Sequence, residues 1–311
     1  SGEGSSGSGS SGEGSQPGHQ AAGCPGEFNL PRSVRKFACD GVWVRPRPAA
    51  LVPQGLALGP NGTAYLSGYL GGPPGQRPCQ VLRVDRDTGK TLNLLSRIEG
   101  EVPGRGVLYC HHGGGIGLND EGLWVAETFR LWLLDPDALE GDALEGDALE
   151  GGADPVRRVW RIERPVRGSA MTITDDRIGL AGFTTTRPGK LRWYDVSQVM
   201  ADGVVALGAR PGDGIAGPSA KQRTPSLIQG LTLGPGGVWF SRSQTRCGIL
   251  SGPKGDREFL PGAEGIAFSD PHHVWVVSES GARRFQRMGD RPVIPTLTRI
   301  DIRRLGESPG C

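Results

Sequence analysis

Five stretches of the chain share one pattern of apolar and polar positions. Each begins with a small residue, continues with alternating apolar residues, passes a turn rich in Gly, Asp, Asn or Pro, and ends in a second alternating run. The stretches are PQGLALGPNGTAYLSG from Pro53, GGIGLNDEGLWVAE from Gly114, GSAMTITDDRIGLAG from Gly168, IQGLTLGPGGVWFSR from Ile228 and AEGIAFSDPHHVWVVSE from Ala263. Alternation with a period of two indicates strands, and a turn between two such runs indicates a hairpin.

An aromatic residue recurs at one point of the second run. Tyr65, Trp124, Trp239 and Trp275 share this position, whereas the third copy has Gly179 there. Since a repeated aromatic position within strands is typical of a core, we expect these residues to be buried between neighbouring sheets.

Further alternating runs follow the hairpins. They are QVLRVDRDTG from Gln80, RLWLLDPD from Arg130, KLRWYDVS from Lys190, CGILSGP from Cys247 and LTRIDIRRL from Leu297. Each repeat unit therefore has four strands, joined by a turn, a loop and a second turn. The units recur at roughly the length of a propeller blade, which predicts an all-β fold that closes as a ring. We expect a β-propeller of about five blades, with six as the alternative. The run FACDGVWVRP from Phe37 is expected to supply the outer strand of the last blade and close the ring.

Two segments have biased composition. Residues 1–22 are rich in Gly and Ser and have nothing with which to form a core, which predicts a disordered tail. Residues 137–151 hold three copies of DALEG and read as a low-complexity loop insertion. The propeller domain is then residues 23–311. The first residue, Ser1, fits a processed mature protein or an excised fragment.

The composition narrows the partners and the compartment. The chain of 311 residues has a formal net charge of +2, which gives no reason to expect nucleic acid. No apolar stretch is long enough for a transmembrane helix. Six widely spread cysteines without a C-x-x-C pair favour disulfides and an extracellular, secreted protein over a zinc site. We expect a small molecule or an extracellular protein as the partner.

Sequence alone leaves 15 ways to pair six cysteines. We expect Cys79–Cys110 before any other bridge, because both residues fall in loops on the same face of the first visible blade. Closing this loop should stabilise the fold by about 3–4 kcal/mol in the chain-entropy model.

The fourth and fifth repeats carry a resemblance to known propellers. IQGLTLGPGGVWFSRSQTRCGIL resembles repeats of virginiamycin B lyase-like propellers, and AEGIAFSDPHHVWVVSESGARRF is similar to NHL and gluconolactonase-like propellers. The lyase resemblance implies a His before the first strand of a blade and a Glu ending a second strand, near a divalent metal. His112, with His111 beside it, and Glu127 come nearest to these roles. The lactonase resemblance implies a Glu, an Asn and an Asp on a calcium or zinc ion in the channel, and Glu264 is the candidate for the first of these.

Propeller geometry places the candidate residues at one end of the ring. Loops that enter the inner strands share a face with loops that join second to third strands, and this face usually binds ligands. The binding candidates are Gln54, His111, Ser169, Gln229, Arg242, Glu264 and Glu279, with His112 and Glu127 as catalytic and Glu264 and Glu127 as metal candidates. His112, Glu127 and Glu264 are expected to point into one opening. The structural alternative pairs the glutamates with Arg130, Arg242 or Arg283.

Two functions remain open. The first is a secreted binding scaffold that holds a ligand or protein partner on this face. The second is a lyase- or lactonase-like enzyme with a divalent cation, calcium or magnesium, in the central channel. Because Gln stands where the lyase His would be in the best-matching repeats, we favour the scaffold and leave enzymatic activity undecided.

Overall fold

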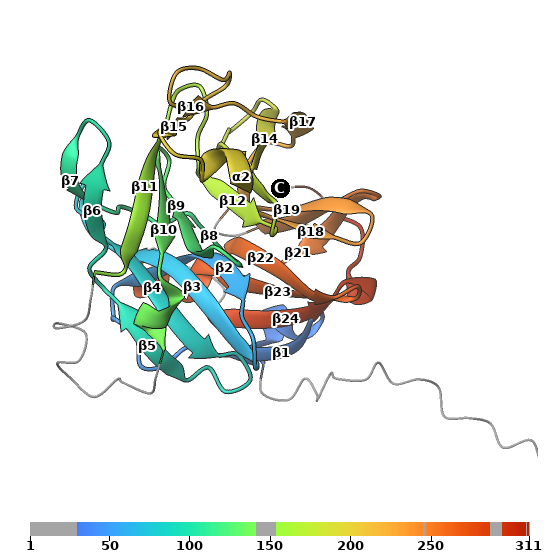
Figure 1. Cartoon of the computed structure of the whole chain (residues 1–311). Coiled ribbons are helices and arrows are strands. Elements are labelled where there is room, and N and C mark those ends of the chain that lie inside the picture. The colour runs from blue at the N-terminus through green and yellow to red at the C-terminus, as the bar shows by residue number, and fades with distance from the viewer. Residues whose placement is uncertain (1–29, 141–153, 245–246, 287–293, 309, 311) are drawn as a thin grey trace, which may run out of the picture.

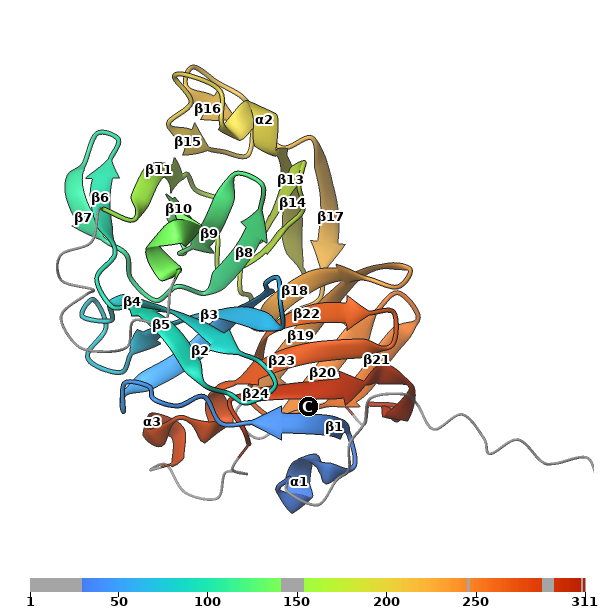
Figure 2. The ribbon, with the colours of Figure 1, turned by 60° about the horizontal axis from the view of Figure 1, so that its bottom comes forward.

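The computed structural model describes residues 30–140, 154–244, 247–286, 294–308 and 310. Within these residues the fold is all-β, and its antiparallel sheets are arranged around a common centre (Figures 1 and 2). The first strand of each sheet is β2 (Leu51–Leu58), β8 (Gly115–Asn119), β12 (Ala170–Ile173), β18 (Ile228–Gly234) or β22 (Ala263–Asp270). Each of these inner strands contacts its two neighbours around the ring, and β22 returns to β2. The ring is therefore closed, and the chain is a β-propeller.

Outward from the inner strands, each sheet repeats the same antiparallel order. The second strands are β3 (Thr63–Leu70), β9 (Gly122–Ala126), β13 (Arg177–Ala181), β19 (Gly237–Gln244) and β23 (His273–Ser278). The third strands are β4 (Cys79–Asp85), β10 (Arg130–Leu134), β14 (Gly189–Asp195), β20 (Cys247–Gly252) and β24 (Leu297–Asp301). The fourth strands are β5 (Thr91–Leu95), β11 (Val156–Ile162), β17 (Ala220–Thr224), β21 (Gly255–Phe259) and β1 (Ala38–Val42).

The number of regular blades differs from the expectation. Four sheets have four strands each, whereas the sheet that begins at β8 has six, because β15 (Ala206–Leu207) and β16 (Ile215–Ala216) extend its outer edge. Regular four-stranded blades therefore number four, against the about five expected, and the six-stranded sheet completes the ring. A sixth sheet in the ring, the alternative, is absent from the described residues. A two-stranded ribbon, β6 (Glu99–Val102) and β7 (Gly106–Tyr109), lies outside the blades.

Few helices accompany the sheets. They are α1 (Arg32–Arg35), α2 (Val196–Val199), α3 (Arg283–Gln286) and the 3-10 turns η1 (Pro136–Leu139), η2 (Glu279–Gly281) and η3 (Ile302–Arg304). None of the described helices has the length and hydropathy to span a bilayer. The tail expected at residues 1–22 lies outside the described residues, as do residues 141–151 of the expected loop insertion, whose first residues fall in and just after η1.

The N-terminal strand closes the ring, as the sequence predicted. β1 pairs antiparallel with β24, with Val42 opposite Leu297, so residues from both ends of the chain form one blade (Figure 2). Val34 and Phe37, which precede this strand, pack into the same core cluster as Ile300. The last blade thus holds the ring closed through backbone hydrogen bonds as well as apolar contacts.

The repeated aromatic position is buried, as expected. Tyr65, Trp124, Trp239 and Trp275 are each the third residue of a second strand, and none is more than 6% exposed. The small residue Gly117 lies opposite Trp124 on the inner strand. The position opposite Trp124 therefore has no side chain that could clash with the indole.

The weak third repeat has a physical explanation. Gly179 takes the aromatic position of β13, and Trp193 lies opposite it on β14. A Cβ atom on Gly179 would come within 2.9 Å of the Trp193 ring. In the next blade the order is reversed, since the Trp239 ring lies where a Cβ on Gly252 would stand. The indole is kept in both blades but comes from different strands, and a sequence alignment does not detect this exchange.

Candidate functional site

One end of the ring holds a cavity of about 300 Å³, here called the axial cavity. Its lining residues are Gln54, Tyr69, His112, Gly114, Thr128, Ser169, Phe183, Gln229, Glu264 and Glu279. Of the residues that the sequence placed in a site, the structure brings together Gln54, His112, Ser169, Gln229, Glu264 and Glu279. His111, Glu127 and Arg242 do not line it.

The inner strands contribute one residue each at the same repeat position. Gln54, Gly114, Ser169, Gln229 and Glu264 each precede a small residue of the inner strand. The small residue is needed because neighbouring inner strands approach closely there. For example, a Cβ atom on the glycine after Gln229 would lie 2.4 Å from the Glu264 carbonyl oxygen. The residue before it therefore faces the centre of the ring.

Four of the other lining residues lie at or just after the ends of second strands, and the fifth, His112, comes from the loop before β8. Tyr69, Thr128, Phe183 and Glu279 each stand four positions after the aromatic position of their repeat. Sequence reasoning missed the first three of these residues. The aromatic repeat contained the signal, because the same offset leads to the cavity in four blades.

Two carboxyl groups meet in the axial cavity. Glu264 is 2% exposed and hydrogen-bonds to Glu279, which begins η2 directly after β23. Burial raises the pKa of Glu264 well above its ordinary value, and the neighbouring charge of Glu279 raises it further. Because two adjacent carboxylates repel each other, we infer that Glu264 stays protonated and that its O–H donates a hydrogen bond to the Glu279 carboxylate.

Gln54 connects this pair to His112. The Gln54 amide nitrogen donates to the Glu279 carboxylate (3.2 Å) and to the Pro53 carbonyl oxygen (3.0 Å). Its oxygen consequently faces His112, 3.0 Å from Nε2, and only a protonated Nε2 can donate to it. Hydrogen bonds thus run from His112 through Gln54 to Glu279, and their direction is set by the carboxylate.

His112 is neutral and tightly held. Burial lowers the pKa of this imidazole to about 4, and the nearby charges of Arg77 and Arg284 lower it further. The ring stacks on Tyr69 with centroids 4.6 Å apart. The backbone of His112 has a φ of 71°, a conformation that is uncommon outside glycine and frequent at functional sites.

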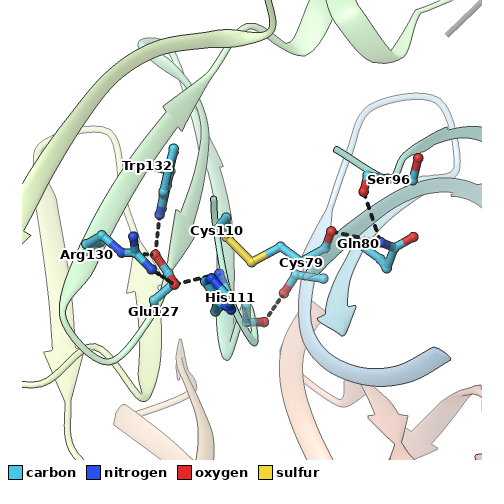
Figure 3. The surroundings of a disulfide bond; sticks show 10 residues. Cys79, Gln80, Ser96, Cys110, His111, Glu127, Arg130 and Trp132 are labelled. Atoms are coloured by element: carbon cyan, nitrogen blue, oxygen red, sulfur yellow. Dashed lines mark hydrogen bonds and ion pairs between the residues drawn. A yellow bond between two sulfur atoms is a disulfide. The ribbon is translucent and has the colours of Figure 1, made fainter. Parts of the chain in front are cut away.

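The loop that carries His112 is anchored by a disulfide. Cys79 and Cys110 are bonded, as the sequence predicted, with Cα atoms 5.3 Å apart (Figure 3). The Cys79 backbone N–H donates to the Cys110 carbonyl oxygen at 2.9 Å, and the Ser67 hydroxyl donates to Gly113 at 2.8 Å. Cys39 and Cys247 are also in disulfides, and the described part of the chain has no free cysteine.

We expect replacement of Cys79 and Cys110 together by alanine to lower the free energy of unfolding by about 3–4 kcal/mol, because a long loop is freed in the unfolded state. The two cysteines are 31 positions apart in the sequence. Urea unfolding of the variant beside the wild type measures this loss. An unchanged unfolding midpoint would contradict the prediction.

The Glu127 carboxylate is held by hydrogen-bond donors of the protein and does not line the axial cavity, so the expectation that it shares an opening with His112 and Glu264 was wrong. Its carboxylate accepts from the Arg130 guanidinium (2.7 Å), the Trp132 indole (2.6 Å) and the His111 backbone N–H (2.6 Å) (Figure 3). Burial raises the pKa of Glu127, while the Arg130 charge acts in the opposite sense. The residue that lines the cavity at this strand end is Thr128.

Arg242 also has other partners, and His111 lies outside the cavity lining. Arg242 donates to the Ser226 carbonyl oxygen at 2.8 Å and to Asp256 at 3.0 Å, away from the cavity lining. Burial lowers the pKa of His111, and Arg130 adds to the effect. For a calcium or magnesium ion the cavity offers the oxygen atoms of Glu264 and Glu279, and Glu127 is already fully engaged elsewhere.

The fold and the cavity define a β-propeller with a polar site at one end of its channel. No protein-family model and no curated protein matches the sequence. The PQQ-bound form of an aldose sugar dehydrogenase from Streptomyces coelicolor is 15% identical with a TM-score of 0.42, and the match covers 85% of this chain and 97% of that one.

Two other solved structures are similar at the same level. A luciferin-regenerating enzyme is 13% identical with a TM-score of 0.39, covering 83% of this chain and 94% of that one. Inactive virginiamycin B lyase from Staphylococcus aureus with quinupristin is 11% identical with a TM-score of 0.33, covering 75% and 94%. All three are β-propellers. The likeness concerns the fold alone, and no site residue is transferred from them.

Proposed function

We propose that this protein is a secreted β-propeller that binds a small, neutral, hydroxyl-bearing molecule in the axial cavity. The observation that carries the proposal is the lining, in which hydrogen-bonding side chains surround the buried Glu264 and its partly buried partner Glu279, and none of the described lining residues is Lys or Arg. Ser169 and Gln229 can each donate and accept a hydrogen bond. The Glu279 carboxylate accepts only, so it favours ligand hydroxyl groups and disfavours anions.

The size and the walls of the cavity support a ligand of this class. A volume of about 300 Å³ is at the lower end for small-molecule sites. Tyr69 and Phe183 add aromatic faces on which the C–H face of a ring can pack. The Cys79–Cys110 disulfide supports an oxidising compartment, where such a ligand is met outside the cell.

Calorimetric titration with a panel of neutral monosaccharides and the anionic analogue gluconate tests this proposal. We expect a neutral member of the panel to bind and gluconate to bind far more weakly. Glu279→Gln should weaken binding of the neutral member about 10-fold or more, since a hydrogen bond to a charged group is lost. Glu121→Gln, an exposed change, is the matched control. Failure of the neutral panel to bind, or unchanged binding by Glu279→Gln, would contradict the proposal.

The alternative of a lyase- or lactonase-like enzyme is favoured by the carboxyl pair. A protonated Glu264 beside an ionised Glu279 supplies an acid and a base in one cavity, which is the arrangement that general acid–base catalysis uses. A calcium or magnesium ion would be held by the same two groups in place of their shared proton. Hydrolysis of a model lactone can be measured with and without each ion. Hydrolysis by the wild type that is lost in Glu264→Gln would favour an enzyme over a binding protein.

A further inference from the structure

A second cluster of chemically active side chains lies at the other end of the last blade. His273 begins β23, and the far end of that strand leads to Glu279 in the axial cavity. Cys39 of β1 and Asp301 of β24 join His273, and the ligand-type atoms of the three residues all lie within 4.8 Å of one another. All three residues are buried. The cluster therefore spans the three strands through which the ring closes.

The imidazole of His273 is held in the orientation that a metal ligand needs. Its Nδ1 is 2.8 Å from the Asp270 carboxylate, which fixes the ring. Its Nε2 has no hydrogen-bond partner, and it is shielded from solvent because the residue is only 6% exposed. A carboxylate on one ring nitrogen with the other free for a metal is the usual support of metal-bound histidines. The unpartnered Nε2 is thus the nitrogen atom that could bind a metal ion in this cluster.

Asp301 is likewise prepared as an ionised ligand. The Arg303 guanidinium donates to both of its oxygens, at 2.9 and 2.7 Å, and the Arg303 backbone N–H donates to one of them at 3.0 Å. The cluster therefore combines an anionic oxygen ligand with a free imidazole nitrogen. A sulfur atom next to them completes a donor set of nitrogen, oxygen and sulfur, which suits zinc better than calcium or magnesium.

Whether the three donor atoms can bind a metal ion depends on the state of the sulfur atom. Cys39 is disulfide-bonded, and a disulfide sulfur is a poor ligand in comparison with a thiolate. We propose that reduction of the Cys39 disulfide converts the cluster into a Zn²⁺ site formed by Cys39, His273 and Asp301. A thiol or phosphine reductant supplies two electrons and two protons are taken up, so two thiols form. Zinc binding then releases the Cys39 thiol proton, and water takes the fourth position.

Zinc titration of the full chain against a chromophoric chelator tests this proposal. After phosphine reduction and removal of excess reductant, we expect one tightly bound Zn²⁺ that the oxidised protein does not bind. Cobalt in place of zinc should give a thiolate-to-metal charge-transfer band. His273→Ala should abolish both signals, and Asp270→Asn should weaken the affinity about 10- to 100-fold. His272→Ala, an exposed neighbour, is the matched control and should bind as the wild type does.

A second variant covers the case in which reduction unfolds the protein. Cys39→His places a metal ligand at this position without reduction, and the freed thiol is blocked by alkylation. We expect this variant to bind one Zn²⁺ under oxidising conditions, and to lose it when Asp301→Ala is added. Equal zinc affinity of reduced wild type and reduced His273→Ala would overturn the proposal, as would absence of binding by both the reduced wild type and Cys39→His.

Discussion

Replacement of Glu127 by alanine should lower the free energy of unfolding by about 3–5 kcal/mol, because it leaves a half-buried guanidinium and a buried indole N–H without their partner. The Arg130 side chain is 17% exposed and that of Glu127 is 5% exposed. Water therefore replaces the lost carboxylate poorly. Glu163→Ala is the matched control, since its pair with Arg161 is more exposed, at 38% and 32% of the two side chains, and should contribute about 0–1 kcal/mol.

Urea unfolding and ligand titration of the same variant distinguish the two roles of Glu127. A structural role predicts a large loss of stability, with ligand affinity in the axial cavity changed by less than about 10-fold under conditions where the variant is folded. If Glu127 instead acted in the site with His112, stability would be nearly unchanged and binding would be lost. The second result would restore the expectation drawn from the lyase resemblance.

Much of the cavity could be predicted because its position follows from the repeat. The residue before the small position of each inner strand faces the axis, so Gln54, Gln229 and Glu264 could be placed from sequence alone. The same periodicity explains the error at Glu127. Because side chains alternate along a strand, a shift of one residue moves a side chain to the other face. Thr128, four positions after the aromatic residue, lines the cavity, whereas Glu127 points to Trp132.

Other features depend on contacts that no local pattern contains. The stacking of His112 on Tyr69 joins two blades, and the Glu264–Glu279 hydrogen bond joins two strand ends. Arginines were the expected partners of these glutamates, whereas the structure places a hydrogen bond between the two carboxyl groups. Sequence spacing gives the end of the ring at which a residue lies, but not which side chain it meets there.

The carboxyl pair should make the stability of the protein fall as the pH rises above the ordinary pKa of a glutamate. Burial and the charge of Glu279 raise the pKa of Glu264 well above 4.5 in the folded state. Below about pH 4.5 Glu264 is protonated in both the folded and the unfolded state, so it makes no contribution to the pH dependence of the free energy of unfolding. Above it the unfolded chain releases the proton and the folded protein keeps it. The free energy of unfolding then falls by about 1.4 kcal/mol per pH unit, until the folded protein also ionises.

Glu264→Gln isolates this effect, because an amide can still donate to the Glu279 carboxylate but does not titrate. Urea unfolding at a series of pH values should show the variant gaining on the wild type by about 1.4 kcal/mol per pH unit, from the ordinary pKa upward. Groups that do not interact with Glu264 titrate equally in both proteins, so they cancel in the difference. Glu121→Gln, on the exposed surface, should follow the wild type throughout. Parallel curves for Glu264→Gln and the wild type would show that Glu264 ionises as an ordinary glutamate, and the shared-proton pair would have to be abandoned.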